Sequence, residues 1–506
     1  MSENPEAPVR FTFGVPSTHG IVLSLDLPRL AALGAGTVTA AIALMAHLPV
    51  PVAAAAASVG LALAYGRIQG MVLIAWVGPI ASYGARALLV RHRCRVGLPG
   101  GTLAARRSAG GEQAARPADA LPRALRLPRS LGRGEIAQSK MAARALGVVC
   151  EPRSGALGLS GAGWELCAVL EVASAAPFAL RERSEQVEAI AAWAEVLSDT
   201  CAEAGSVHAL QWVERCVPDV AGSAAAWMAD HLAEDTPPMR VKDYAALLER
   251  LDARSAVHEV YIAVSVRPKA RSRDEAISQA VFEVQLIATR LSAIGFEVTP
   301  LDADGLYCLL RAATEGVARA ALPAHQRAGP ITMAQDERWD AVRADGLWHR
   351  TMCVAAWPRT EVGPAWLEPL LVAASPGALR TLAVHLHPTP PSRSRRRVTV
   401  RRTTAEANLE QRRMRGWLVG AQERREAEEA ARRDAELVAG YGEHRIAAVV
   451  TVSAATEDAL EAATRNVEAA AGRSGIALRT LYGRQADGLA ATLPLCRLAM
   501  RSTGGF

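Results

Sequence analysis

The chain has 506 residues, of which 50% are hydrophobic and only 5% aromatic, and its 57 Lys and Arg against 51 Asp and Glu give a formal net charge of +6. This composition excludes a disordered, a collagen-like and a disulfide-stapled chain. The eight cysteines lie far apart without a Cys-x-x-Cys pair, which indicates reduced thiols in a cytosolic compartment rather than a zinc framework.

The first predicted elements are two membrane-spanning helices. They follow an N-terminal segment, residues 1–29, that we expect on the cytoplasmic side. From Leu30 to Gly66 there are 37 residues without one Asp, Glu, Lys or Arg, and a single span needs about 20 apolar residues. Two prolines divide the stretch, and helices end before prolines. The pattern therefore predicts a hairpin of two spans, Leu30–Leu48 and Val50–Gly66, embedded in the lipid bilayer.

A second uncharged stretch, Ile68 to Ala85, follows directly. It fits a third span, and it also fits a helix along the cytoplasmic interface with Trp76 and Tyr83 at the depth of the headgroups. The connection Gly66–Gly70 is short for a full reversal of the chain, which favours the interfacial helix. Residues 30–96 are thus predicted to form a transmembrane hairpin plus an interfacial helix.

The charges that follow predict the orientation of the protein. Between Arg86 and Arg144 there are 13 Lys and Arg but only three acidic residues. Because basic residues collect on the cytoplasmic side of spans, we expect a multi-pass protein of the cell membrane with the bulk of the chain in the cytoplasm. Residues 97–162, rich in Gly, Arg, Ala and Pro, are predicted to be a linker. The basic block lacks interleaved aromatic residues, so we do not expect direct binding of nucleic acid.

Beyond residue 163 a pattern of strand, helix and strand recurs four times. The first two repeats are assigned to one α+β subdomain, residues 163–320, the third to residues 321–400 and the fourth to residues 443–506. Alternating and continuous apolar runs predict strands at 164–172, 209–213, 258–266, 296–301, 346–357, 381–387, 445–452 and 476–481. The helices are predicted near 184–204, 273–294, 364–373 and 456–474.

Two of these repeats resemble copies of one unit. The second and the fourth both end a helix with Gly, continue with a short strand and then show Ala-Asp-Gly-Leu, at 303–306 and at 486–489. Asp-Gly suits a tight turn, so we interpret the tetrapeptide as a turn followed by a short helix rather than as a ligand loop. The predicted fold class is α+β: an N-terminal transmembrane helical hairpin followed by duplicated ferredoxin-like βαβ units, with a long charged helix inserted.

That inserted helix is assigned to residues 401–442. Opposite charges lie one turn apart from Ala405 to Ala439, which supports a solvated helix. It serves either as an arm that contacts a partner or as a plain connector. The run Arg393–Arg397 that opens the insertion is interpreted as a solvated loop.

A search for chemistry finds no catalytic, cofactor-binding or metal-binding residues to assign. The chain has only three lysines and none follows a glycine, so it has no P-loop. His385 and His387 share one face of a strand, but two ligands give weak support for a metal site. The acidic run Asp336–Asp340 is interpreted as a solvated helix start rather than as paired catalytic carboxylates. We therefore expect a protein that is not an enzyme.

Several of these features together resemble a known family. They are the double span, the basic linker, the repeats, the phrase Gln335–Asp340, the long charged helix and the phrase Leu481–Ala486. In this combination the chain resembles the actinobacterial membrane protein family associated with conjugation and type IV secretion-like clusters. The resemblance covers nearly the whole chain. In that family the body looks like the non-catalytic N-terminal domain of the type IV secretion ATPase.

The resemblance implies a non-enzymatic inner-membrane scaffold of a type IV-like secretion or conjugation apparatus. Such a scaffold would form an oligomer within a complex and would dock a separate secretion ATPase and other membrane subunits. Two alternatives stay open. One is a membrane component of a type VII export system of the EccE type, which also begins with two spans, and the other is a membrane-tethered enzyme with an unrecognised site.

Overall fold

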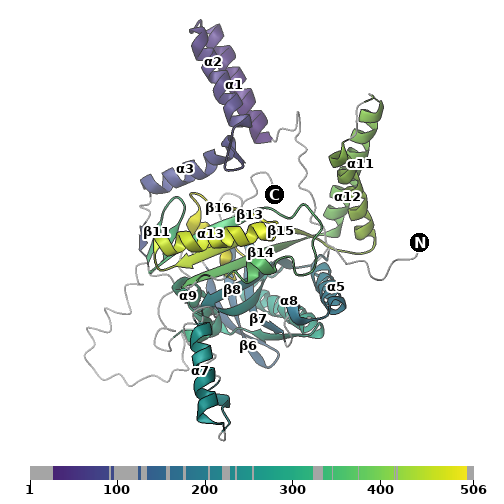
Figure 1. Cartoon of the computed structure of the whole chain (residues 1–506). Helices are drawn as coiled ribbons and strands as arrows, with labels where there is room; N and C mark the ends of the chain where they lie inside the picture. The colour runs from purple at the N-terminus through teal and green to yellow at the C-terminus, as the bar shows by residue number, and fades with distance from the viewer. Residues whose placement is uncertain are drawn as a thin grey trace.

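The computed structural model consists of apolar helices, a large sheet-based body and a helical arm (Figure 1). Helices α1 and α2 point away from the body, α3 lies across their base, and α11 and α12 form the arm on the same side of the body. The residues that the structure describes are 27–89, 93–95, 124–126, 134–154, 160–174, 178–202, 205–218, 228, 230–233, 236–252, 256–322, 334–344, 346–373, 375, 377–414, 416 and 420–498.

The apolar helices α1 (Leu27–Met45) and α2 (Val50–Tyr65) form an antiparallel pair. A small ribbon of β1 (Arg67–Ile68) and β2 (Met71–Val72) connects α2 to α3 (Leu73–Leu89). The first helix has the predicted length but begins and ends three residues earlier, and the second is one residue shorter than the sequence predicts. Within the described residues, α1 alone is long and apolar enough to cross a membrane, and the 16-residue α2 is a shorter apolar helix.

The predicted span boundaries shift accordingly. Leu30 lies inside α1 and Val50 is the first residue of α2, as expected, but Leu48 and Gly66 lie outside both helices. The first helix ends early because the chain turns at His47, which adopts a left-handed backbone with φ of 52°.

Two glycines set the contact between α1 and α2. A Cβ atom added to Gly60 would lie 2.8 Å from the Cα of Gly36, and one added to Gly36 would lie 2.7 Å from the Cα of Gly60. The two backbones therefore touch directly at this crossing. Small residues permit such close packing where lipid surrounds both helices.

The body is built on one 14-stranded sheet with antiparallel pairing throughout. The order along the sheet is β3-β11-β12-β13-β15-β14-β8-β9-β7-β6-β5-β4, with β10 also paired to β7 and β16 to β13. The strands are β3 (Arg93–Arg95), β4 (Ala124–Arg126), β5 (Glu135–Met141), β6 (Arg144–Ser154), β7 (Ser160–Ser174), β8 (Val207–Pro218), β9 (Ala256–Val266), β10 (Phe296–Pro300), β11 (Ala334–Glu337), β12 (Val342–Ala344), β13 (Leu347–Ala356), β14 (Ala378–Thr389), β15 (Glu443–Ala454) and β16 (Ala477–Thr480).

The two halves of the sheet have the same strand order. The first half runs β10-β7-β9-β8 and the second runs β16-β13-β15-β14, and β8 pairs with β14 where the halves meet. The remaining helices are α5 (Arg183–Asp199), α7 (Pro238–Asp252), α8 (Arg273–Ala293), α9 (Ala303–Glu315), α10 (Glu368–Leu371), α11 (Pro391–Met414), α12 (Ala421–Val438), α13 (Glu457–Arg473) and α14 (Gln485–Thr492), with 3-10 turns η2 (Phe178–Leu180) and η3 (Arg319–Ala321).

Helices cover both faces of the sheet. On one face α8 packs on the first half and α13 on the second, each with its own apolar cluster. On the opposite face α9 and α14 share one cluster, in which Leu309 and Ala491 of the helices join Val213 and Val449 from the two halves. On the α8 and α13 face the two clusters also meet, because Trp212 of β8 and Val384 of β14 pack against both of them.

The helices α8 and α13 begin with equivalent N-terminal capping residues. Ser272 caps α8 by accepting a hydrogen bond from the Glu275 N–H, and Thr456 caps α13 in the same way from Ala459. Each helix begins with acidic residues, which the positive end of a helix favours. The two repeats thus share their local signals as well as their strand order.

Three segments differ from the sequence-based expectation. The predicted linker 97–162 contains β5 and β6 and the start of β7, because its small residues pair as strands. The predicted long helix 401–442 is instead two antiparallel helices, α11 and α12, which pack against each other. The run Arg393–Arg397 is part of α11 and not a loop. The helix predicted at each Ala-Asp-Gly-Leu phrase is present, as α9 and α14, and the phrase lies in its first turns rather than in a turn before it.

Candidate membrane-anchor junction

Four aromatic rings join α3 to the body. Trp76 and Tyr83 lie two turns apart on α3 and face Trp339, which follows β11, and Tyr482, which follows β16. The Trp76 and Trp339 rings stack with centroids 6.2 Å apart, and Tyr83 meets Trp339 edge-on at 5.2 Å. Tyr482 stacks on Trp339 at 6.1 Å and its hydroxyl accepts a hydrogen bond of 3.1 Å from Gln69. Such ring pairs stabilise a contact beyond their buried area.

Polar contacts surround the rings. Arg86 of α3 forms an ion pair with Glu337 at 3.4 Å and donates a hydrogen bond to the carbonyl of Gly483. The Gly483 N–H donates in turn to the Trp339 carbonyl at 2.6 Å. Glu337 also accepts a hydrogen bond of 3.2 Å from the backbone N–H of Ala486 in the first turn of α14. We call the apolar helices α1, α2 and α3 the anchor. Arg86 and Glu337 thus connect this anchor to both β11 and α14.

Burial changes the acidity of two groups in this junction. Burial raises the pKa of the Glu337 carboxyl above its ordinary value, against the hydrogen bond from Ala486 and the charge of Arg86, which lower it. Burial also raises the pKa of Tyr83, and the nearby carboxylate of Glu337 raises it further. The junction is therefore a partly dry contact in which Glu337 depends on its partners to stay ionised.

The chain enters the sheet directly beyond the junction. β3 pairs with β11 in the register Arg95 to Ala334, Cys94 to Gln335 and Arg93 to Asp336. The anchor is therefore attached to the body both through α3 and through a strand.

Trp76 and Tyr83 have a role that the sequence does not predict. The sequence predicts both at headgroup depth, and in the structure their rings pack against the body. Two apolar side chains of α3 remain open to the surroundings, because Val77 and Ile80 are 49% and 56% exposed. Residues 87–89 of α3 lie outside the side chains that the structure describes.

The acidic run Asp336–Asp340 is structural. It is a strand end and turn, not the predicted helix start. Asp340 pairs with Arg350 at 2.5 Å, and Arg338 pairs with Glu457 at 3.0 Å. The phrase Leu481–Ala486, quoted above for its resemblance, contributes Tyr482 and Gly483 to the same junction.

The two histidines of β14 serve packing. His385 is fully buried, and its Nε2 lies 2.9 Å from the Ala491 carbonyl oxygen. Burial lowers the pKa of this imidazole to about 4. The His387 ring lies against His208, with 5.5 Å between ring centroids. Among the described residues, no three His, Cys, Asp or Glu side chains are placed to hold a metal ion.

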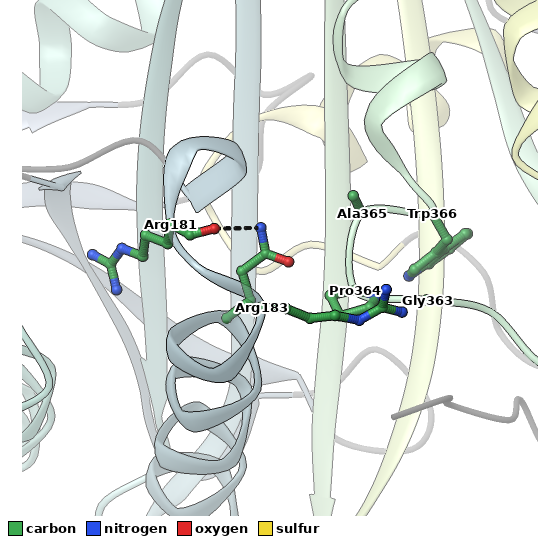
Figure 2. Close-up of a pocket in the computed structure, with 7 residues that line it drawn as sticks. Arg181, Arg183, Gly363, Pro364, Ala365 and Trp366 are labelled. Carbon is green, nitrogen blue, oxygen red and sulfur yellow. Dashed lines mark hydrogen bonds between the residues drawn. The ribbon is translucent and has the colours of Figure 1, made fainter. Parts of the chain in front are cut away.

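A cavity of about 370 Å³ lies between the start of α5 and the loop before α10 (Figure 2). In Figure 2 Arg183 extends toward Pro364, whereas the Arg181 guanidinium points away and its carbonyl accepts a hydrogen bond from Gln186. The lining residues include no nucleophile, carboxylate or imidazole, and they are Arg181, Arg183, Gln186, Gly363, Pro364, Ala365 and Trp366. This cavity does not contain the groups for acid–base or nucleophilic catalysis.

The comparison with known families points elsewhere than the resemblance described above. Residues 250–354 match the EccE family, described as the type VII ESX secretion system translocon EccE. The match runs from the end of α7 through β9, α8, β10, α9, β11 and β12 into β13, and so includes the strand that carries Glu337. No curated protein matches the chain.

The EccE match corrects the predicted family. The assignment to a type IV-like conjugation apparatus, with a body similar to the N-terminal domain of its ATPase, was wrong. The short motifs behind it, Gln335–Asp340 and Leu481–Ala486, are contacts of the anchor junction and are not diagnostic of that family. The alternative that the sequence left open, a type VII component, agrees with the match.

Proposed function

We propose that this chain is a membrane component of a type VII ESX secretion system and that its role is structural rather than enzymatic. The observation that carries the proposal is the EccE match over residues 250–354, which runs from β9 and β10 in the first half of the sheet to β11, β12 and β13 beside the anchor junction. EccE is described as a translocon component and is not a known enzyme family. The proposal extends that description from the matched segment to the whole chain.

In this proposal α1 and α2 cross the bilayer. At 1.5 Å per residue the 19 residues of α1 extend about 28 Å and the 16 of α2 about 24 Å, against a hydrocarbon core of about 30 Å. Local thinning of the bilayer, or residues beyond the helix ends, accommodate this difference between helix length and hydrocarbon thickness. The outer faces are apolar, with Ile42 and Val59 60% and 59% exposed, as suits contact with lipid.

The third apolar helix lies at the membrane surface in this proposal. Its aromatic face packs on the body, and Val77 and Ile80 remain for the acyl boundary. The basic residues between Arg86 and Arg144 then place the body in the cytoplasm. The repeated strand order supports a body made of two ferredoxin-like units joined at β8 and β14.

The partners in this proposal are the other membrane subunits of the ESX complex and a separate ATPase. The test is affinity purification of the tagged full chain from its native membranes in mild detergent, followed by mass spectrometry. We expect recovery of ESX membrane subunits. A matched preparation that lacks residues 27–89 should lose them. Recovery of type IV subunits, or of the chain alone, would contradict the proposal.

A further inference from the structure

The arm formed by α11 and α12 has no role in the anchor junction or in the core of the sheet. Its base is fixed, because Ser394 is fully buried and donates a hydrogen bond to Glu443 at the start of β15. Its two helices are tied together by Arg402, which bonds Glu406 at 2.8 Å and Asp434 at 2.7 Å. The arm is therefore a fixed projection with a defined direction.

The far end of the arm carries exposed cations and an exposed apolar side chain. Arg413 is in the last turn of α11, and Arg424 and Arg425 are in the first turns of α12. All three are exposed, and none forms an ion pair with a residue that the structure describes. Beside them Met414 is 78% exposed.

The position of this end relates it to the anchor. In Figure 1 the arm rises on the same side of the body as α1 and α2, and its far end reaches higher in the view than α3. In the proposed orientation the arm therefore extends from the body toward the cytoplasmic surface of the bilayer.

We propose that the far end of the arm, with Arg413, Met414, Arg424 and Arg425, is a second membrane contact that binds the headgroups of anionic phospholipids. This inference rests on the proposed membrane placement of α1 and α2. A guanidinium group matches a phosphate in geometry and charge, and basic residues at the cytoplasmic surface are attracted to anionic lipid. Met414 supplies an apolar side chain at the depth where acyl chains begin. Two separate contacts with the bilayer would hold the body at a fixed angle to the membrane.

The test is hydrogen exchange on the full chain in lipid nanodiscs. We compare discs of pure phosphatidylcholine with discs that contain phosphatidylglycerol, and follow amides at the far ends of α11 and α12. Exchange there should be slower with phosphatidylglycerol, and about 0.5 M salt should remove the difference because screening weakens exposed charge contacts. The variant Arg413→Glu/Arg424→Glu/Arg425→Glu should lose the protection.

The matched control reverses three arginines at the base of the same arm, in Arg393→Glu/Arg395→Glu/Arg396→Glu. These residues are also exposed but lie at the opposite end of α11, so protection at the far end should persist. Equal loss in both variants, or equal exchange in the two lipids, would refute the proposal. Protection that appears only when other subunits are bound would identify an acidic protein surface instead.

Failure of the membrane placement gives a different result. A chain that does not enter either type of disc would contradict both the spanning role of α1 and α2 and the arm contact. A chain that enters both discs and leaves the arm in fast exchange would overturn the arm contact alone.

Discussion

Glu214 and Arg380 meet in the middle of the sheet, on the two strands that join its halves. Both side chains are nearly inaccessible, at 4% and 3%, and Arg380 donates two hydrogen bonds to the carboxylate at 2.7 and 3.0 Å. Arg380 also donates to the Leu371 carbonyl at 2.7 Å. Because water reaches neither group, the charge of each side chain is stabilised by the charge of the other.

Loss of this arginine should be costly. Arg380→Ala leaves the Glu214 carboxylate buried with one remaining charged neighbour, and removal of one partner of a buried pair costs about 3–5 kcal/mol. Urea unfolding in detergent, followed by tryptophan fluorescence, measures the change. The control is Arg338→Ala, which removes a pair whose members are 51% and 57% exposed and should cost at most about 1 kcal/mol. Equal effects of the two variants would count against this account.

The same carboxylate makes stability depend on pH through His258. Hydrogen bonds with Cys216 and Glu214 raise the pKa of His258 to about 10, and the Glu214 contact is 2.7 Å long. The unfolded chain has the ordinary value of about 6.5. The protonated ring therefore stabilises the fold fully below that pH, and the contribution is lost as the pH rises through 10.

We expect the urea midpoint to fall as the pH rises from about 7 to 10. In His258→Gln, which has no titrating ring, the fall over the same range should be smaller. The measurement is a series of unfolding curves at fixed ionic strength. Parallel pH profiles of the two proteins would show that the ring of His258 does not titrate in this way.

At the scale of elements, the α1–α2 contact depends on the absence of side chains. Gly60→Ile places a branched side chain where even a Cβ would lie 2.8 Å from the Gly36 backbone, so the helices must separate. Gly34→Ile is the control, because nothing lies within 4 Å of its added Cβ. We expect the melting temperature in detergent to fall by several degrees for Gly60→Ile and to change little for Gly34→Ile. The reverse order would contradict the observed crossing.

The α3 contact depends on one ring. Trp339 touches Trp76, Tyr83 and Tyr482, so Trp339→Ala removes three of the aromatic contacts at once. Truncation of a packed Trp costs about 3–5 kcal/mol, and here we expect that loss to release α3. Hydrogen exchange in the described part of α3 should accelerate. Trp366→Ala, which disturbs a ring pair with Trp357 outside the junction, should leave α3 unchanged.

At the scale of the whole molecule, the two ends of the helix pair should face opposite sides of the membrane. In a Cys94→Ser/Cys308→Ser background the remaining cysteines are buried, so a new surface thiol is readily detected. A membrane-impermeant maleimide should label His47→Cys, in the α1–α2 turn, on intact cells. It should label Arg395→Cys, at the base of the arm, only after lysis. Labelling of Arg395→Cys on intact cells would reverse the orientation.

The elements of the body were largely predictable, but their assembly was not. Strands β7, β9 and β15 have long apolar runs and match the predicted positions closely. Strands β5 and β6 were missed because Ala, Gly and Ser in a basic stretch have the composition of a linker. The break between α11 and α12 was missed because the charge pattern continues on both sides of it.

The junction was out of reach of sequence reasoning for a different reason. Trp76 and Trp339 are 263 positions apart, and Trp76 and Tyr482 are 406 apart. No local pattern indicates that these rings meet, although each lies in a stretch that the sequence singled out. The acidic run around Trp339 stands out in the sequence and suggests either catalysis or a helix start. In the structure its carboxylates form ion pairs at and just beyond the end of β11.

The packing of α14 has a consequence for the order in which the protein forms. Gln211 of β8 donates hydrogen bonds to the carbonyls of Ala491 and Leu493 and accepts one from the Cys496 N–H, so the shared core closes only when this segment arrives. The ribosome adds about 400 residues between the end of α3 and this segment. At about 5–20 residues per second that takes roughly 20–80 seconds. The apolar helices thus reach the translocation machinery long before the body can complete its folding, and the unfinished sheet must wait, tethered, with one face still uncovered.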